Sequence, residues 1–287
     1  MASPLSSPRF ATLPERALIR VSGAEWRGFL QGLITQDVET LEAGAMRYGA
    51  LLTPQGRLLY DLFVTAEDGG ALLDAPAAGR EGLAARLRMY RLRAKVEIEL
   101  VEGAVVVLFG GSVDPGQGWR ADPRLAALGW RGVDLPAPAG CLAASVQDHD
   151  LHRLALGVAD LTRDALADRV YALEANFDLL NAVDFKKGCF VGQEITSRMK
   201  RRSVVKSRMV PLRFQGPAPC PGAEVLNGSL RAGEVWSGAE GIALALLRLD
   251  RAVDAELTVE GRRVRLDVPQ WLSAAVAEAI SAQDVRP

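Results

Sequence analysis

The chain of 287 residues contains only three cysteines and two histidines. Cys141, Cys189 and Cys220 stand far apart with no C-x-x-C pair, which argues against a disulfide framework and against a closed four-thiolate zinc or cluster site within one chain. His149 and His152 lie three residues apart, and no third metal ligand stands near them in the sequence. We therefore expect no metal site in this chain, and the scarcity of histidine also argues against a serine-hydrolase triad.

Long apolar runs and a strong net charge are missing as well. No run approaches the roughly 20 apolar residues that a membrane-spanning helix needs. The net charge is −1, so any nucleic-acid binding has to come from local basic patches. Residues 1–14 are rich in serine and proline and have neither an apolar signal core nor the arginine enrichment of a transit peptide. We therefore expect a cytoplasmic protein with no membrane partner.

The first half of the chain alternates between strand and helix patterns. Strands are predicted at 15–21, 47–53, 57–65, 71–74, 91–96 and 104–109, and the second and third form a hairpin around Pro54-Gln-Gly56. Helices are predicted from 26 to 41, after a capping box at Ser22 and Glu25, and at 77–90. This order indicates an α+β sheet with helices on one side.

The second half ends in a different pattern. Residues 110–139 hold much of the glycine and proline and read as an irregular connection, followed by helices at 147–159 and 164–180. Six short strands then predict a small β-barrel or sandwich, at 205–214, 224–226, 231–237, 241–248, 256–259 and 262–268. We expect a region 1–203 of two α+β modules, divided near 110–145, and a C-terminal β-barrel domain at 204–287.

The most distinctive stretch is Lys187-Gly-Cys-Phe-Val-Gly-Gln-Glu194. Cys189 follows two lysines and precedes a predicted helix, and both cations and helix N-termini favour the reactive thiolate. We expect Cys189 to be accessible to solvent and more reactive than Cys141 and Cys220. Glycines on both sides permit close backbone approach or a positive φ. The alternative reading is a solvated basic loop with a buried structural thiol.

Two further side chains stand out by their position. Asp61 shares one face of its predicted strand with the apolar Leu59 and Phe63, so its carboxylate either reaches a hydrogen-bonding partner or lines a cavity. An edge-strand aspartate in water is about as well supported. Arg198 lies four residues after Glu194 on the predicted helix, which places the two on one face as a possible ion pair.

The Lys187–Glu194 stretch resembles the signature K-G-C-[aromatic]-x-G-Q-E of the YgfZ-type folate-binding proteins, at every fixed position. These proteins are relatives of the glycine-cleavage T protein and support iron–sulfur protein assembly. Other segments resemble the same family, in places its mitochondrial branch: 28–38, 48–62, 90–96, 122–131, 173–176 and 238–245. The resemblance implies a T-protein-like ring of modules with antiparallel or mixed sheets, helices and a small C-terminal β-barrel.

The resemblance also implies a tetrahydrofolate site in the central channel, with Cys189 as the working residue. Tyr48, Asp61 and Lys187 are candidate contacts for the pterin, and the carboxylates of the glutamate tail would take arginine partners. The candidates for that tail are Arg91, Arg93 and Arg198. The whole motif comprises Lys187, Gly188, Cys189, Phe190, Gly192, Gln193 and Glu194. Phe190 stands where tyrosine is commoner, so a phenol role is lost there.

Three functions are considered, in this order. The first is a monomeric, folate-dependent accessory protein for the maturation or repair of iron–sulfur proteins, in which Cys189 lends one ligand or does redox chemistry. The second is an aminomethyltransferase, although Asp74 to Glu81 offers no clean equivalent of the aspartate that T proteins need. The third is a tRNA-modification or RNA-binding factor, based on the basic residues at 198–202 and 86–95, with few aromatic residues between them.

Overall fold

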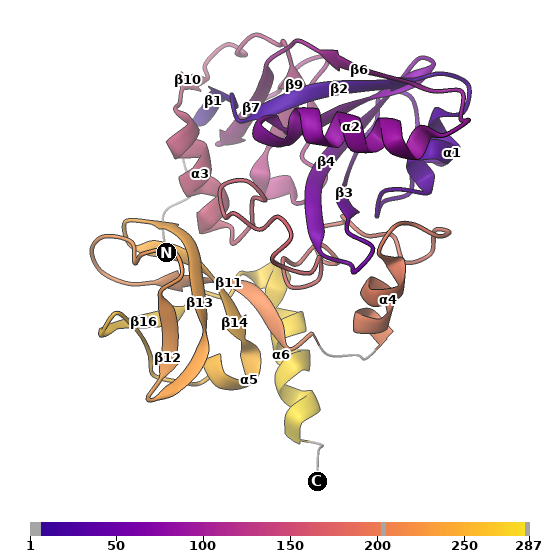
Figure 1. Ribbon diagram of the computed structural model, residues 1–287. Helices are drawn as coiled ribbons and strands as arrows, with labels where there is room; N and C mark the ends of the chain where they lie inside the picture. The colour runs from indigo at the N-terminus through magenta and orange to yellow at the C-terminus, as the bar shows by residue number, and fades with distance from the viewer. Residues whose placement is uncertain (1–6, 202–204, 285–287) are drawn as a thin grey trace.

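The computed structural model describes residues 7–201 and 205–284. Two five-stranded sheets and their helices form one part of the molecule, and a closed six-stranded β-barrel forms the other (Figure 1). The predicted α+β class and the C-terminal barrel are thereby confirmed. Within the described residues, no helix is long and apolar enough to cross a membrane.

The first sheet is antiparallel and has the strand order β3-β4-β5-β2-β6. Its strands are β2 (Arg16–Ser22), β3 (Met46–Leu52), β4 (Leu58–Glu67), β5 (Gly70–Pro76) and β6 (Glu97–Val101). Helices α1 (Trp26–Gln31) and α2 (Arg80–Arg91) cover one face, with a 3-10 turn at Ala77–Gly79 (Figure 1). The helices stay in place because their apolar sides bury against Ile19, Leu62 and Leu73 of the sheet.

The second sheet is mixed and has the order β10-β1-β7-β9-β8. Its strands are β1 (Pro8–Thr12), β7 (Val105–Gly110), β8 (Arg120–Ala121), β9 (Trp130–Val133) and β10 (Leu142–Ala143), with a 3-10 turn at Ala126–Leu128. Only β1 and β10 pair in parallel. Helix α3 (Val146–Ala155) begins at a capping box between Ser145 and Asp148.

The barrel closes in the order β11-β14-β13-β12-β15-β16. Its strands are β11 (Ser207–Arg213), β12 (Glu224–Asn227), β13 (Leu230–Ala239), β14 (Ile242–Arg248), β15 (Leu257–Val259) and β16 (Arg262–Leu266). All six predicted strands are therefore present. The short helix α5 (Leu249–Ala252) and the C-terminal helix α6 (Gln270–Asp284) add Leu249, Leu272 and Val276 to the barrel core.

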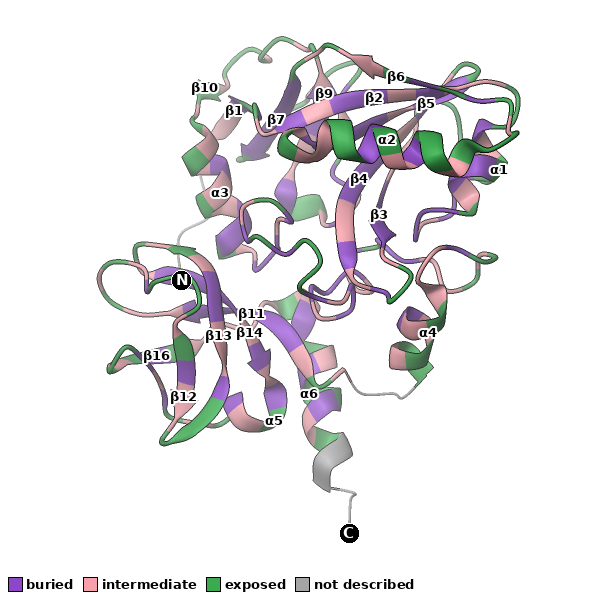
Figure 2. Cartoon of the chain, in the orientation of Figure 1, coloured by how far each residue is buried: buried purple, intermediate pink, exposed green. Residues whose placement is uncertain are grey.

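A central core joins the barrel to the first sheet. The face of the sheet that the helices leave free carries Tyr48 and Phe63, which pack with Phe177 from the turn-rich segment 156–192 and with Trp236 and Leu244 of the barrel. Figure 2 shows buried residues along the strands and exposed residues along the outer side of α2. Phe190 of the cysteine motif belongs to the same core, which attaches the motif to this part of the molecule.

Several local predictions were wrong. The helix predicted from 26 to 41 ends at Gln31, although Ile34 and Leu41 are still buried through turns. The predicted capping box also fails, since Glu25 makes no side-chain cap bond and its Oε2 instead accepts from the Lys95 N–H at 2.6 Å. That contact fixes the loop after α2 against the start of α1, a long-range demand that the local pattern does not reveal.

Two more elements differ for backbone reasons. The strand predicted at 91–96 is instead the end of α2 and a tight turn, and β6 begins at Glu97. The helix predicted at 164–180 is absent because Ala165, Asp168 and Asn176 have positive φ, which interrupts any helix. Strands β1, β8, β9 and β10 and helix α6 were not predicted, and β8 and β9 lie within the segment 110–139 that was expected to be irregular.

Candidate functional site

The cysteine loop presents one side chain to solvent and buries the next. Cys189 is exposed, whereas Phe190 is 6% exposed and belongs to the central core. The Asp184 carboxylate accepts from the backbone N–H groups of Lys186 and Lys187 at 2.7 and 3.1 Å, which closes the loop just before the motif. The thiol therefore sits on a loop anchored at both ends and not on a free tip.

Lys187 clamps the loop to the segment that follows α1. Its Nζ donates to the backbone carbonyls of Ile34 and Gln36 at 2.7 and 2.8 Å, in the segment that follows α1. Burial lowers the pKa of Lys187 to about 8, although Asp37 and Asp184 oppose the shift. The ammonium is thus engaged by the protein's own backbone and lies 5.5 Å from the centre of the Phe190 ring.

Gly192 and Gln193 fit the loop against the β3–β4 hairpin turn. Gly192 has φ +81°, and a Cβ there would lie 2.6 Å from the carbonyl oxygen of Thr53. Only glycine tolerates both the conformation and the contact. The backbone N–H of Gln193 donates to the carbonyl oxygen of Phe190 at 3.1 Å, and its side-chain Nε2 donates to the carbonyl oxygen of Gly188 at 3.3 Å. These bonds explain the Gly-Gln pair without any ligand.

Helix α4 (Gln193–Arg201) follows the loop and extends away from the core (Figure 1). Glu194 and Arg198 are both exposed, and within the part of the chain that the structure describes no ion pair joins them. Lys200 instead lies 3.5 Å from the buried carboxylate of Asp178. The expected Glu194–Arg198 pair is therefore not formed, and Arg198 points its charge to solvent.

Asp61 reaches a partner and is not in water. Both of its carboxylate oxygens accept from Arg16 Nη1 at 3.0 Å, and the Tyr48 hydroxyl donates to it at 3.4 Å. All three side chains are buried. Burial raises the pKa of Asp61, against the opposing field of Arg16. Of the alternatives open from the sequence, the bonded carboxylate is the one found.

Arg16 is the start of a buried ionic network that links the two sheets. Its Nε donates to Asp74 at 2.6 Å, and Asp74 is also paired with Arg131 of β9. The guanidinium of Arg131 stacks 3.8 Å from the Phe63 ring centre. Two arginines lower the pKa of Asp74 despite its burial, so this carboxylate is held ionised. Arg131 lies in a segment that carried the family resemblance, but sequence reasoning did not identify it or Arg16.

Arg91 and Arg93 lie elsewhere. Both are exposed at the C-terminal end of α2, and with Lys95 they line a groove of about 590 Å³ beside residues 22–24. The residues predicted to hold a folate are thus divided among a buried network, a backbone clamp, a solvent-facing helix and a groove at the end of α2. As arranged, this residue set does not fit a tetrahydrofolate, because Arg91 and Arg93 line a groove that Tyr48 and Asp61 do not line, and the buried members already satisfy one another.

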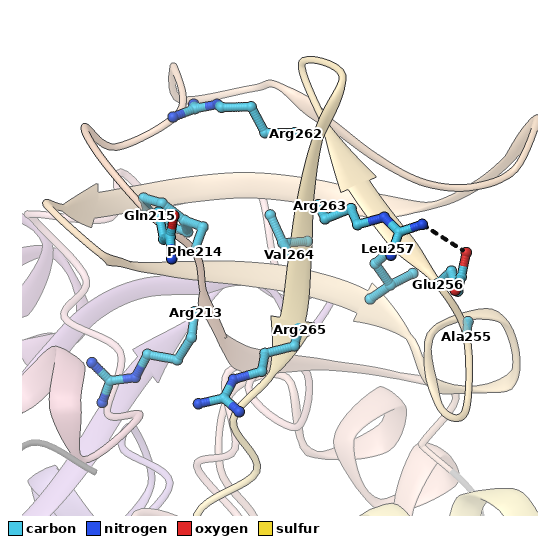
Figure 3. Close-up of a pocket in the computed structure, with 10 residues that line it drawn as sticks. All are labelled: Arg213, Phe214, Gln215, Ala255, Glu256, Leu257, Arg262, Arg263, Val264 and Arg265. Carbon is cyan, nitrogen blue, oxygen red and sulfur yellow. Dashed lines mark ion pairs between the residues drawn. The ribbon is translucent and has the colours of Figure 1, made fainter.

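A larger groove, of about 870 Å³, lies in the barrel domain. Four of its ten lining residues are arginines: Arg213, Arg262, Arg263 and Arg265. Figure 3 shows Arg213 and Arg265 extending to the same side, while Arg263 turns toward Glu256, at 3.7 Å. None of the predicted site residues lines this groove, so it is separate from the cysteine loop.

The described residues contain no group of three or more His, Cys, Asp or Glu side chains that could hold a metal ion. Within the described residues Cys189 therefore belongs to no such group, and iron–sulfur clusters normally need four ligands.

Comparison with known proteins now decides the family. The chain is 32% identical over 300 residues to the human mitochondrial iron–sulfur cluster assembly factor IBA57, covering 90% of this chain and 84% of that protein. The mouse IBA57 is 30% identical, with 82% and 76% covered, and the Mycosarcoma maydis homologue is 33% identical, with 77% and 60% covered. The chain belongs to the IBA57 family of iron–sulfur cluster assembly factors.

The IBA57-family assignment agrees with two other comparisons. Residues 206–274 match the model of the CAF17 C-terminal β-barrel domain. The fold matches the crystal structure of glycine cleavage system aminomethyltransferase T from Bartonella henselae, with a TM-score of 0.73 at 18% identity, over 96% of this chain and 87% of that one. The expected T-protein-like fold is thereby confirmed. The expected cytoplasmic location is contradicted, because the IBA57 relatives are named as mitochondrial proteins.

Proposed function

We propose that this chain is an accessory protein in the maturation or repair of iron–sulfur proteins, and that Cys189 is the residue through which it acts. The observation that carries the proposal is an exposed thiol on a loop fixed by Lys187 and Phe190, in a member of an iron–sulfur assembly family. A fixed loop holds the sulfur in one position for a partner, which reduces the entropy lost on binding.

In this proposal the iron–sulfur unit is cargo. Cys189 lends a single ligand, losing its thiol proton on coordination, while the client or assembly protein supplies the others. The hydrogen bonds from Lys187 to the backbone carbonyls of Ile34 and Gln36 hold the loop in place against the segment that follows α1. Folate is left out of the proposal, because Tyr48, Asp61 and Lys187 already have partners within the protein, and Arg91 and Arg93 line a separate groove.

Aminomethyl transfer and RNA binding are not proposed. The similarity to aminomethyltransferase T shows the fold alone at 18% identity. Asp74, the aspartate of the stretch compared with T proteins, is paired with Arg16 and Arg131 through both of its carboxylate oxygens. No described feature favours RNA over another partner of the basic segments.

The first prediction tests Cys189 in cells that lack the gene. Cys189→Ala should fail to restore the activity of iron–sulfur enzymes, while its melting temperature stays within about 2 °C of the wild type, because an exposed side chain adds little to stability. Cys220→Ala is the matched control, since Cys220 is also exposed. Enzyme activities and cluster content would be measured in both strains.

Restoration by Cys189→Ala to the wild-type level would refute the proposal. Cys220→Ala should restore activity fully. If Cys220→Ala also fails to restore enzyme activity while its melting temperature is normal, the loss of activity is not specific to the cysteine loop. The assignment of Cys189 would then be wrong as well.

A further inference from the structure

The end of helix α2 carries an unusual surface. Leu92 and Met89 are 86% and 60% exposed, the two highest values among the exposed large apolar residues of the described chain. Residues 82–96 contain no acidic residue and five basic ones: Arg86, Arg88, Arg91, Arg93 and Lys95. The side chains of Arg91, Arg93 and Lys95 make no hydrogen bond or ion pair within the described residues. Apolar and cationic groups are thus both left without partners here.

The backbone holds Leu92 outward at an energetic penalty. Leu92 has φ 47° and ψ −107°, and the Ala94 N–H donates to the Arg91 carbonyl at 2.8 Å across it. These values are close to the first central position of a type II′ turn, which glycine dominates because L side chains are strained there. A leucine in this position gains no packing in return. Strain of this kind is concentrated at sites where function maintains it.

The surface lies close to the cysteine loop. Glu25, just before α1, accepts from the Lys95 backbone, and Ile34, just after α1, accepts from Lys187. Helix α1 has six residues and spans about 9 Å. In Figure 1 the end of α2, helix α1 and the loop before α4 follow one another down the right-hand side. A protein–protein interface of about 800 Å² per partner is roughly 30 Å across, which is wide enough to include both the end of α2 and the cysteine loop.

We propose that Met89, Arg91, Leu92, Arg93 and Lys95, the Leu92 patch, anchor an acidic iron–sulfur client or assembly protein while Cys189 reaches its cluster site. This inference rests on the proposed function and adds to it where and how the partner is held. Leu92 and Met89 enter an apolar hollow of the partner, and its carboxylates pair with the arginines around that hollow. The groove of about 590 Å³ that Arg91, Leu92, Arg93 and Lys95 line receives part of the partner in return.

Two other occupants fit less well. An anionic membrane surface is broad and would meet Glu25, Glu97 and Glu99, which are exposed beside the patch, whereas an acidic protein segment can contact the arginines without covering those carboxylates. Single-stranded RNA needs aromatic side chains on which bases stack. The exposed apolar groups here are leucine and methionine, and Tyr90 is only half-exposed.

The second prediction separates strain from function with Leu92→Gly. Glycine relieves the strained turn, so the melting temperature should stay the same or rise by a few degrees. The apolar anchor is lost, so support of iron–sulfur enzymes in the deletion strain should fall by at least threefold. Leu151→Ala on α3, which is 44% exposed and outside the patch, is the matched control and should support the enzymes fully. Arg91→Glu with Arg93→Glu is a second test that leaves Leu92 in place.

A photo-crosslinking residue at position 92, compared with one at position 151, identifies the partner. We expect position 92 to capture an iron–sulfur client or assembly protein through an acidic segment. The purified partner should then bind Leu92→Gly at least about tenfold more weakly than the wild type, as expected for loss of an interface hot spot. Capture of lipid, RNA or a second copy of this chain at position 92 would overturn the inference, as would equal capture at both positions.

The outcomes distinguish the two proposals. If Cys189→Ala loses enzyme support while Leu92→Gly and the double arginine variant keep it, the Leu92 patch is wrong and the proposed function stands. If Cys189→Ala keeps support, the proposed function itself fails.

Discussion

At the scale of single residues, two charged side chains that were expected to contact a ligand bind other parts of the protein instead. Lys187 precedes Cys189 and was expected to bind a ligand or favour its thiolate, yet it is used to bind two backbone carbonyls. Asp61 was a candidate folate contact and is instead neutralised by Arg16. The half-buried ammonium of Lys187 and the buried carboxylate of Asp61 thus both form their hydrogen bonds within the protein, as polar groups removed from water generally do.

The third prediction concerns Arg16. Arg16→Ala leaves Asp61 and Asp74 buried with one cation fewer, so the free energy of unfolding should fall by about 3–5 kcal/mol, the usual consequence of breaking a buried ion pair. Arg20→Ala is the control on the same strand. It removes an exposed pair with Glu67 and should change the free energy by only about 0–1 kcal/mol.

Chemical denaturation followed by circular dichroism would measure both Arg16→Ala and Arg20→Ala. Equal losses in the two variants would show that the buried network contributes no more than a surface pair, and the account of Asp61 given above would then be wrong.

At the scale of elements, the hairpin turn and the cysteine loop support each other. Gly192 packs on Thr53, and Gly56 of the hairpin packs on Ile195 of α4, where an added Cβ would lie 3.0 Å away. The turn therefore sets the place where α4 begins, and with it the position of Cys189. Neither element could hold this geometry alone, because short helices and isolated hairpins are marginal in water.

The fourth prediction compares two glycines of the motif. Gly192→Ala should destabilise the protein by about 2 kcal/mol, because alanine is strained at φ +81° and would meet the Thr53 carbonyl at 2.6 Å. Gly188→Ala should stay within about 0.5 kcal/mol, since nothing lies within 4 Å of its added Cβ.

Thermal melting would give the two stabilities, and the alkylation rate of Cys189 would report on the loop. We expect the rate to change in Gly192→Ala and not in Gly188→Ala. A stable Gly192→Ala with a normal alkylation rate would contradict the packing described for the hairpin turn.

At the scale of the whole molecule, the region expected to hold a central folate is filled by paired charged side chains and aromatic rings. Tyr48, Phe63 and Phe177 form one cluster, with ring centroids 4.7 and 5.2 Å from Tyr48. The arginines of the network lie over these rings, so the first sheet, the second sheet and the barrel meet in one packed core. The T-protein-like fold is retained, while the predicted contact residues are used for packing.

The fifth prediction follows from that packing. Tetrahydrofolate at millimolar concentration should leave the melting temperature unchanged, because a ligand stabilises only the state that binds it, and the expected contacts are occupied. Isothermal calorimetry should likewise show no saturable heat. A clear rise in melting temperature, with a binding isotherm, would mean that folate uses residues other than those predicted here.

The sequence by itself determined the parts of this protein that depend on local pattern. Alternating strands, the Pro54-Gln-Gly56 turn and the six C-terminal strands were all predictable, because side-chain period and turn residues act over a few positions. The motif from Lys187 to Glu194 indicated the iron–sulfur assembly family, since its residues are consecutive in the chain. The exposure of Cys189 was also expected, from the two lysines that precede it in the loop.

Only the tertiary structure decided which polar groups meet. Arg16 and Arg131 reach Asp74 from positions 58 and 57 residues away in the chain. The clamp of Lys187 spans 153 residues to Ile34. No local pattern encodes such pairs, because a buried charge is neutralised by whichever partner the packed sheets bring to it. For the same reason Arg91 and Arg93, which lie within a segment that resembles the family, could be separated from Tyr48 and Asp61 only once the fold was known.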